Sequence, residues 1–303
     1  MRVLVTGSEG FVGGHLRRGF AEHGHAIIEA RGPTLDDGID IRDSERLFAL
    51  LDATRPDAIV HLAAVSSVGK SHRDPIETLD VNVVGTVALL AAARRAAPDA
   101  RLLIVGSGEV YGRASTDAPT PETTPLEPLS PYAASKAAAE MLALQFHRSY
   151  GTDVVCARSF SHLGRGQTTS FSVPSFAAQL GAIRKGEAPP VLRTGDLTPI
   201  RDFLHVADVI DAYELLLTKG VSGGVYNVAS GTGRTVQSLL DEMLELSGIR
   251  VKVEPDPARL RPVEIPALIG DPSRLTALGF RPERQVRDAL REVLEEYGAL
   301  RRG

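Results

Sequence analysis

Short apolar runs alternate with longer amphipathic stretches through the first half of the chain. The short runs predict buried strands, and apolar residues spaced three and four apart predict helices that cover them. This alternation is typical of βαβ units wound around a parallel sheet. The predicted strands are Arg2–Val5, Ala26–Glu29, Ala58–His61, Arg101–Val105 and Val154–Ala157, and the predicted helices are Phe11–Glu22, Ser44–Ala53, Thr78–Ala96 and Pro131–Tyr150.

The pattern changes after Arg158, where a Gly- and Ser-rich stretch begins. We expect a doubly wound parallel Rossmann-type sheet from residues 1–158 and about 200–228, with a smaller C-terminal α/β substrate lobe from about 159–199 and 229–303. Residues 255–272, rich in proline and arginine, predict irregular structure that faces the substrate. The later predicted elements are a helix over Pro174–Ile183, a strand over Gly224–Val228, and helices over Val236–Leu246 and Val286–Tyr297.

Composition narrows the classes of function. The 303 residues carry a net charge of −4 and are 43% hydrophobic, which fits a globular protein and offers no basic stripe for nucleic acid. The single cysteine, Cys156, lies in an apolar run and is expected to be buried. The N-terminus does not resemble a secretory signal, and we expect that no apolar run reaches membrane-spanning length, so we expect a cytoplasmic protein without membrane contact.

A glycine-rich loop follows the first predicted strand and opens the first helix. Its glycines are Gly7, Gly10 and Gly13, with Phe11 and Val12 between the last two. The first glycine permits a tight turn, the second lets a pyrophosphate approach the backbone, and the third allows close helix packing. Such a loop can also exist without a ligand, but its place between strand and helix favours a dinucleotide.

The residue after the second strand reads the adenosine ribose of such a cofactor. Arg31 holds that position, and a cation there favours the 2′-phosphate of NADP over the free hydroxyl of NAD. Glu29 would read the ribose instead if the strand ended earlier, and Arg31 could also be a solvated loop cation. We therefore expect NADP, with NAD as the alternative.

Tyr132 and Lys136 lie four residues apart at the start of a predicted helix, on one face. A nearby ammonium stabilises a phenolate, so Lys136 is expected to lower the pKa of Tyr132 and make it a proton donor. Ser107, at the end of the fourth strand, is placed to hold a carbonyl oxygen. A Tyr-x-x-x-Lys pair alone occurs by chance, but its combination with the glycine loop predicts hydride transfer to a carbonyl.

These motifs resemble the extended short-chain dehydrogenase/reductase family over the whole chain. The resemblance implies that Asn82 supports the cofactor side and that Lys136 holds the nicotinamide ribose beside Tyr132. It further implies that the cofactor contacts Asp40, Ile41, Leu62, Ala63, Ala64 and His162.

Within that family the later motifs are most similar to GDP-4-keto-6-deoxy-D-mannose reductases. These motifs are Arg158–Gln167, Val173–Ala177, Arg201–Phe203 and Arg261–Leu275. The resemblance implies that Arg201 and Arg261 clamp a diphosphate, that Glu264 binds the guanosine ribose, and that the substrate also contacts Ser107, Glu109, Ser161 and Val173. The chain departs from the family where Ser161 replaces an asparagine and Arg165 a proline.

The resemblance thus implies an oxidoreductase that reduces the C4 ketone of a nucleotide-linked 4-keto-6-deoxyhexose and forms a homodimer, and no metal is expected. Glu109 leaves open a 4,6-dehydratase or epimerase that retains its cofactor, because related dehydratases carry an acid/base glutamate there. A non-catalytic dinucleotide sensor is the third alternative. It would be expected to lack Tyr132 or Lys136, and this chain has both.

Overall fold

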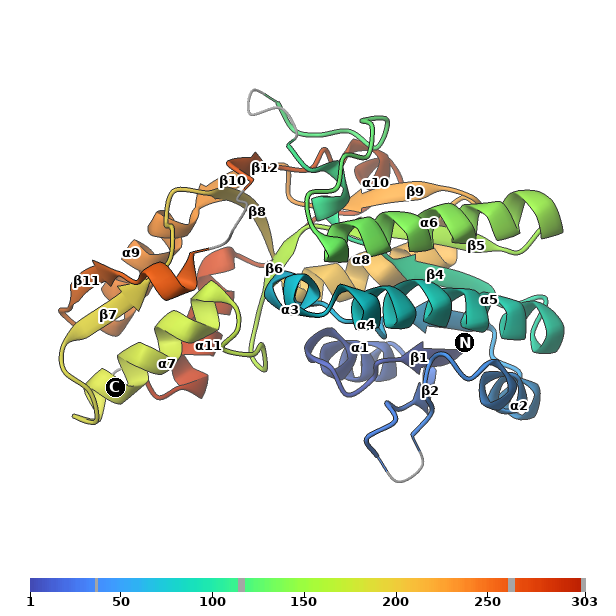
Figure 1. Cartoon of the computed structure of the whole chain (residues 1–303), viewed down its shortest axis with the longest axis horizontal. Helices are drawn as coiled ribbons and strands as arrows, with labels where there is room; N and C mark the ends of the chain where they lie inside the picture. Colours follow the sequence, from blue (N-terminus) through green and yellow to red (C-terminus); the bar gives the residue numbers. More distant parts are fainter. Residues whose placement is uncertain (36–37, 114–117, 261–264, 301–303) are drawn as a thin grey trace.

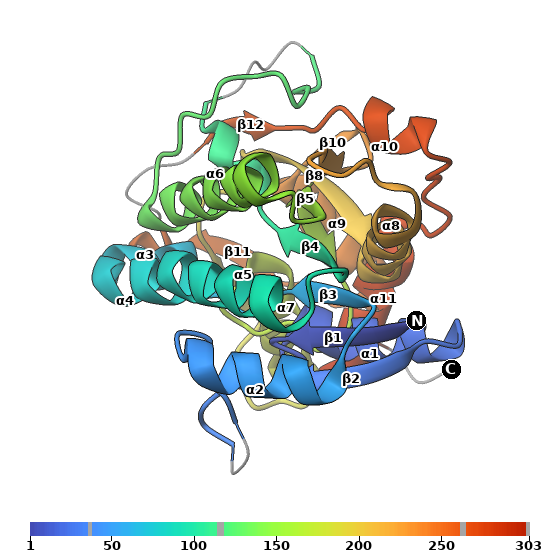
Figure 2. The same cartoon turned by 90° about the vertical axis from the view of Figure 1, so that its right-hand side faces the viewer.

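The computed structural model describes residues 1–35, 38–113, 118–260 and 265–300. A six-stranded parallel sheet lies at the centre of the larger lobe, in the order β2-β1-β3-β4-β5-β9. Figure 2 shows this sheet in the middle of the molecule. The doubly wound, Rossmann-type fold class is confirmed. The strands are β1 (Arg2–Thr6), β2 (Ala26–Ala30), β3 (Ala58–His61), β4 (Arg101–Val105), β5 (Val154–Ser159) and β9 (Val225–Val228).

Helices cover both faces of the sheet, because its strands are apolar on both sides. On one face, Leu16 and Phe20 of α1 (Phe11–Glu22) pack with Tyr213 of α8 (Val206–Lys219). The other face is covered by α2 (Ser44–Thr54), α5 (Gly85–Ala96) and α6 (Pro131–Tyr150). The predicted helices agree with α1, α2 and α6 to within a residue, the segment that leads into α5 differs, and α8 was not predicted.

The segment predicted as one helix over Thr78–Ala96 has an internal irregularity. It begins at Pro75 because the Asp74 carboxylate accepts the backbone N–H of Glu77, 3.1 Å away, and so caps α4 (Pro75–Leu79). A π-helical turn, η1 (Asp80–Val84), then separates α4 from α5. Such turns insert one extra residue and often occur at functional sites. A short helix, α3 (Val68–Arg73), precedes them.

The stretch Pro75–Ala96 is also long and apolar enough to cross a membrane by length and composition alone. The expectation that no run reaches this length was therefore wrong. Half of its most apolar window is buried inside the protein, where Leu89 and Leu90 pack in the core between α2 and the sheet. Core helices of this kind pass the same test of length and hydropathy.

The second lobe lies to the left in Figure 1 and has its own core, which includes Phe176, Leu180, Leu240 and Leu290. Its helices are α7 (Ser172–Arg184), α9 (Val236–Ser247) and α11 (Val286–Glu296). Two small sheets accompany them: β7 (Val191–Thr194) pairs with β11 (Lys252–Pro255), and β8 (Ile200–His205) pairs with β6 (Ser161–Leu163), β10 (Gly233–Thr235) and β12 (Ala267–Leu268).

The predicted division at residues 158, about 200 and 228 stays a proposal. β8 opens the segment assigned to the dinucleotide-binding domain, yet its pairing partners are strands of the second lobe. The short helix α10 (Ser273–Ala277) belongs by sequence to the second lobe, yet Leu275 packs in the core of the first. The stretch predicted as irregular, residues 255–272, contains among its described residues the end of β11 at Pro255, the short helix η3 (Pro257–Arg259), β12 and an isolated bridge at Gly270.

Candidate active site

The glycine-rich loop lies at the carboxyl ends of β1 and β3, where the strand order reverses. A Cβ on Gly7, whose φ is +69°, would lie 2.8 Å from the backbone nitrogen of Ala63. A Cβ on Gly13 would lie 2.3 Å from the carbonyl oxygen of Gly7, and one on Gly10 would lie 3.3 Å from the same atom. The bare backbone at a topological switch point fits the pyrophosphate of a dinucleotide.

Two of the predicted cofactor residues form an aromatic pair beside this loop. Phe11 stacks on His162 with ring centroids 5.9 Å apart and an interplanar angle of 12°. His162 comes from β6 of the second lobe, so this contact joins the lobes at the predicted cofactor site. His15 adds a second link through its Nε2, 2.7 Å from the Arg165 carbonyl oxygen. Arg165, the residue that replaces the family's proline, thus contacts the first lobe through its backbone.

The stretch from His61 to Ala64 closes the loop from the β3 side. The ring of His61 lies between the hydroxyls of Thr6 and Thr86, at 2.8 and 2.9 Å. Burial lowers the pKa of His61 to about 3, with a smaller contribution from Lys136, so the ring is neutral at pH 7. Of the other predicted residues, Val12 and Leu62 pack against one core cluster and Ala63 against the other. Because these side chains point into the core, the backbone of Val12, Leu62 and Ala63 is the part that can line a cofactor.

At the end of β2 the structure brings together the residues predicted to meet the adenosine. Arg31 is the first residue after the strand, and its carbonyl accepts the N–H of Ile39 at 2.8 Å. Asp40, which follows Ile39, accepts a hydrogen bond from Arg42 through Oδ2 at 2.5 Å. This bond is the main reason that the pKa of Asp40 lies below its usual value. Ile41 is buried against Gly85.

Ser107, Tyr132 and Lys136 converge at the carboxyl end of β4. Ser107 caps the short helix η2 (Gly108–Tyr111) by accepting the Glu109 N–H. Its side chain is also hydrogen-bonded to the Tyr132 phenol. Lys136 donates from Nζ to the Val105 carbonyl, 2.9 Å away. The Glu109 carboxylate lies near enough to Tyr132 to raise the pKa of the phenol. The three predicted catalytic side chains and Glu109 thus form one cluster.

The pKa values in this cluster differ from the sequence-based expectation. Burial raises the pKa of Tyr132 to about 12, against the opposing effect of its hydrogen bond with Ser107. Burial also lowers the pKa of Lys136 to about 8. The expected lowering of the Tyr132 pKa by Lys136 is therefore wrong for this structure, because desolvation dominates and the ammonium is engaged by Val105.

A link that the sequence did not reveal joins the π-helical turn to the catalytic helix. Asn82 accepts the Val65 N–H at 2.7 Å and donates to the Val65 carbonyl at 3.1 Å. It also donates to the Ser135 hydroxyl at 2.8 Å, and Ser135 in turn donates to the carbonyl oxygen of Tyr132 at 2.7 Å. The amide of Asn82, in the π turn, thus holds both the segment after β3 and the catalytic helix.

The predicted substrate residues lie on the second lobe or beside it. Ser161 pairs with Phe203 across β6 and β8, close to the buried Arg201 on β8. Val173 is buried near the start of α7 and packs in the second core. Arg261 and Glu264 lie outside the described residues, so the clamp expected from Arg201 and Arg261 stays a prediction.

Asp202, next to Arg201, has a role that the sequence did not suggest. Its carboxylate accepts hydrogen bonds from the backbone of Ser230, Gly231 and Gly270, at 2.8, 2.9 and 3.3 Å. The side chain is fully buried, and burial raises its pKa. Asp202 thus fixes the segments that follow β9 and β12 beside Arg201.

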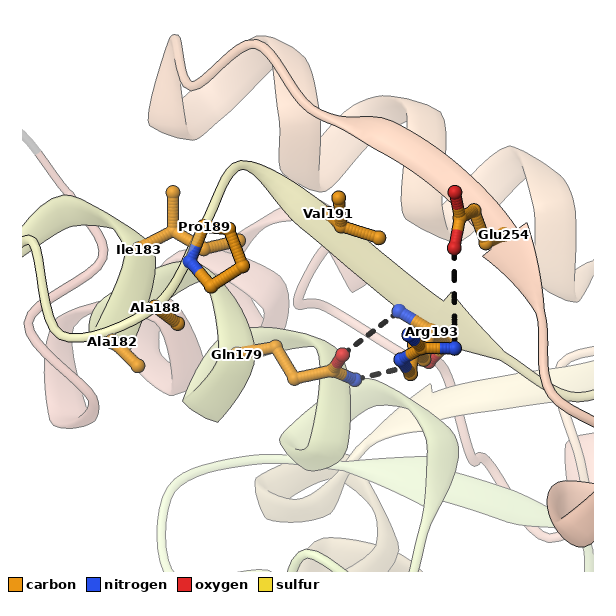
Figure 3. Close-up of a pocket in the computed structure, with 8 residues that line it drawn as sticks. All are labelled: Gln179, Ala182, Ile183, Ala188, Pro189, Val191, Arg193 and Glu254. Carbon is orange, nitrogen blue, oxygen red and sulfur yellow. Dashed lines mark hydrogen bonds and ion pairs between the residues drawn. The ribbon is translucent and has the colours of Figure 1, made fainter.

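A separate pocket of about 300 Å³ lies on the second lobe (Figure 3). Gln179 crosses it to hold the backbone of Arg193, whose side chain is 3.9 Å from Glu254. None of the predicted site residues lines it. Over the described parts of the chain, no group of three or more His, Cys, Asp or Glu residues is placed to hold a metal ion.

Comparisons with known proteins identify the family of this chain. A family model described as GDP-mannose 4,6 dehydratase matches residues 37–293. A curated GDP-6-deoxy-D-mannose reductase of Pseudomonas aeruginosa is 36% identical over 302 residues, which cover 98% of this chain and 97% of the relative.

Two solved structures are similar over almost the whole chain. The structure of RMD from Pseudomonas aeruginosa complexed with NADPH has a TM-score of 0.90 and 34% identity, covering 98% of this chain and 99% of that one. The Thermus thermophilus UDP-glucose 4-epimerase complex with NAD has a TM-score of 0.86 and 30% identity, with the same coverage. This chain therefore belongs to the GDP-mannose 4,6-dehydratase family, within the extended short-chain dehydrogenases/reductases.

Proposed function

We propose that this chain uses NADPH to reduce the C4 ketone of GDP-4-keto-6-deoxy-D-mannose, which gives GDP-D-rhamnose. The observation that carries the proposal is the convergence of Ser107, Tyr132 and Lys136 beside the glycine-rich loop. The similarity to a GDP-6-deoxy-D-mannose reductase, and to a relative complexed with NADPH, supports both the substrate and the cofactor. NADH is the alternative cofactor.

The chain's own residues would handle the proton and the orientation of the ketone. A bound reduced nicotinamide supplies a hydride to C4. Tyr132, whose pKa of about 12 keeps the phenol protonated at pH 7, donates its proton to the carbonyl oxygen, so the ketone gains a hydride and a proton. The Ser107 hydroxyl donates a hydrogen bond to the same oxygen, and Lys136 would hold the nicotinamide ribose.

The residues on the second lobe are proposed to bind the nucleotide. Arg201 and Arg261 would clamp the diphosphate with their guanidinium groups, and Glu264 would accept the ribose hydroxyls. Ser161 and Val173 would contact the sugar and the nucleotide from β6 and α7. Ser161 is shorter than the asparagine usual in the family, so we expect the sugar contact there to be weaker than in its relatives.

A dehydratase that retains its cofactor is a second candidate, and Glu109 is the observation that favours it. Its carboxylate lies close enough to Tyr132 to raise the pKa of the phenol, so it could act as an acid or base on the sugar. An assay with two substrates separates the candidates. NADPH should be consumed with GDP-4-keto-6-deoxymannose and not with GDP-mannose alone. Formation of a 4-keto sugar from GDP-mannose without added reductant would favour the dehydratase.

We also propose a cytoplasmic homodimer that has no membrane contact. The apolar residues Ile76, Leu79 and Val84 are 73%, 44% and 51% exposed along α4 and η1, and Met141 is 63% exposed on the neighbouring α6. Exposed apolar side chains on adjacent helices suit contact with a second copy. Sedimentation of the purified chain tests this, and a monomer at micromolar concentration would contradict it.

A further inference from the structure

Three side chains link the glycine-rich loop to the end of β2. The Glu9 carboxylate accepts the backbone N–H of Gly32 through Oε1 at 2.6 Å. The Ser8 hydroxyl lies 3.4 Å from Glu9 Oε2 and 3.1 Å from Glu29 Oε2. Two carboxylates therefore share one hydroxyl at the edge where the adenosine ribose is read.

Glu29 contacts two cations at this edge. Arg17 donates from Nη1 to both oxygens of Glu29 at 3.0 Å, and Arg31 lies 3.6 Å from Glu29 Oε2. The side chain of Arg31 is 45% exposed, so it can still meet a ligand from solvent. Glu9 is also exposed. Because it binds the backbone of Gly32, the residue next to Arg31, it adds a negative charge at this edge.

These charges act in opposite directions on the 2′ position of a cofactor. A guanidinium attracts a 2′-phosphate, whereas a carboxylate repels it and accepts a hydrogen bond from a free 2′-hydroxyl. Glu9 also occupies the Gly32 N–H, a backbone donor that an anion could otherwise use. The exposed carboxylate therefore opposes the selectivity that Arg31 provides.

Resting on the proposed function, we propose that Glu9 is a specificity-determining residue that limits the preference for NADPH. Glu9 holds the affinity for NADPH close to that for NADH, and its charge is the cause. Replacement of the charge should therefore favour NADPH selectively, while the fold and the rest of the dinucleotide site stay as they are.

Glu9→Gln tests the proposal, because the amide oxygen can still accept the Gly32 N–H and only the charge is lost. Dissociation constants for NADPH and NADH are measured by calorimetry without substrate, so the readout does not depend on turnover. We expect the ratio of the two constants to shift about five- to tenfold toward NADPH. Glu22→Gln, at the exposed end of α1, is the control with the same change of charge and should leave the ratio unchanged.

The outcomes are distinct from those of the proposed function. An unchanged ratio in Glu9→Gln, or equal weakening of both cofactors, would overturn the role of Glu9 while the reductase proposal stands. Failure of the unaltered protein to bind either dinucleotide would overturn the proposed function and this inference with it.

Discussion

The guanidinium of Arg158 on β5 holds the carboxylate of Glu140 on α6 through two hydrogen bonds, 2.9 Å from Nε and 2.6 Å from Nη2. The side chains are only 6% and 5% exposed. Arg158 also donates to the Tyr111 hydroxyl, and Tyr111 donates to Asn227 on β9. The helix that carries Tyr132 and Lys136 is thus fixed to the sheet by a buried ion pair.

Loss of one partner of this pair should be costly. Glu140→Gln leaves the buried Arg158 charge uncompensated, so we expect the free energy of unfolding to fall by about 3–5 kcal/mol in urea titrations. The exposed pair of Arg95 and Glu45, 2.9 Å apart, provides the control, and Glu45→Gln should change stability within the error of the measurement. Equal effects of the two substitutions would contradict this account.

Two adjacent glycines of α1 should respond in opposite ways to alanine. A Cβ on Gly13 would lie 2.3 Å from the Gly7 carbonyl, whereas a Cβ on Gly14 meets nothing within 4 Å. We expect Gly13→Ala to destabilise the protein by about 1–3 kcal/mol and to weaken NADPH binding. Gly14→Ala should stabilise it by about 0.5–1 kcal/mol, since alanine favours the helix. Thermal unfolding and calorimetry check both, and NADPH binding by Gly13→Ala at full affinity would refute the loop assignment.

Tyr132→Phe removes the proposed proton donor and little else. Turnover should fall by about 10²–10⁴-fold or more, while the dissociation constant of NADPH should stay near normal. Tyr150→Phe, at the far end of the same helix where the side chain is 52% exposed, should retain full activity. Steady-state kinetics and cofactor titration measure the two effects separately. Retained turnover in Tyr132→Phe would refute the assigned donor.

Acid should destabilise the fold through His61. Its pKa of about 3 in the folded protein lies below the ordinary value of 6.5, so between these pH values the unfolded chain binds a proton that the folded protein does not. Stability therefore falls as the pH is lowered, by about 2 kcal/mol from this residue between pH 7 and 5. His61→Gln should lose correspondingly less stability over that range in urea titrations. Equal losses in both proteins would show that His61 is not the cause.

Much of the fold could be predicted because its signals are local. The apolar runs of β3 and β4 and the capped start of α6 at Ser130 and Pro131 were located to the residue. The π turn at Asp80–Val84 was not predicted, and its Asn82 bonds to Val65 and Ser135, which are distant in the chain. No spacing within one helix encodes that contact.

The candidate site shows the same limit. The cluster of Ser107, Tyr132 and Lys136 followed from motif order, but the raised pKa of Tyr132 did not, since desolvation depends on what the fold packs around the phenol. Likewise, the sequence predicted that Arg31 meets the adenosine ribose. The opposing carboxylate of Glu9 lies 22 positions earlier and meets that edge only through the fold.

Transfer of the hydride itself tests the central claim most directly. NADPH carrying two deuterons at C4 of the nicotinamide is mixed with GDP-4-keto-6-deoxymannose and the protein, and the product is examined by NMR and mass spectrometry. The account predicts one deuteron at C4 of the 6-deoxyhexose and one NADP⁺ formed for each sugar reduced. A product without deuterium, or sugar conversion with no net consumption of NADPH, would contradict it.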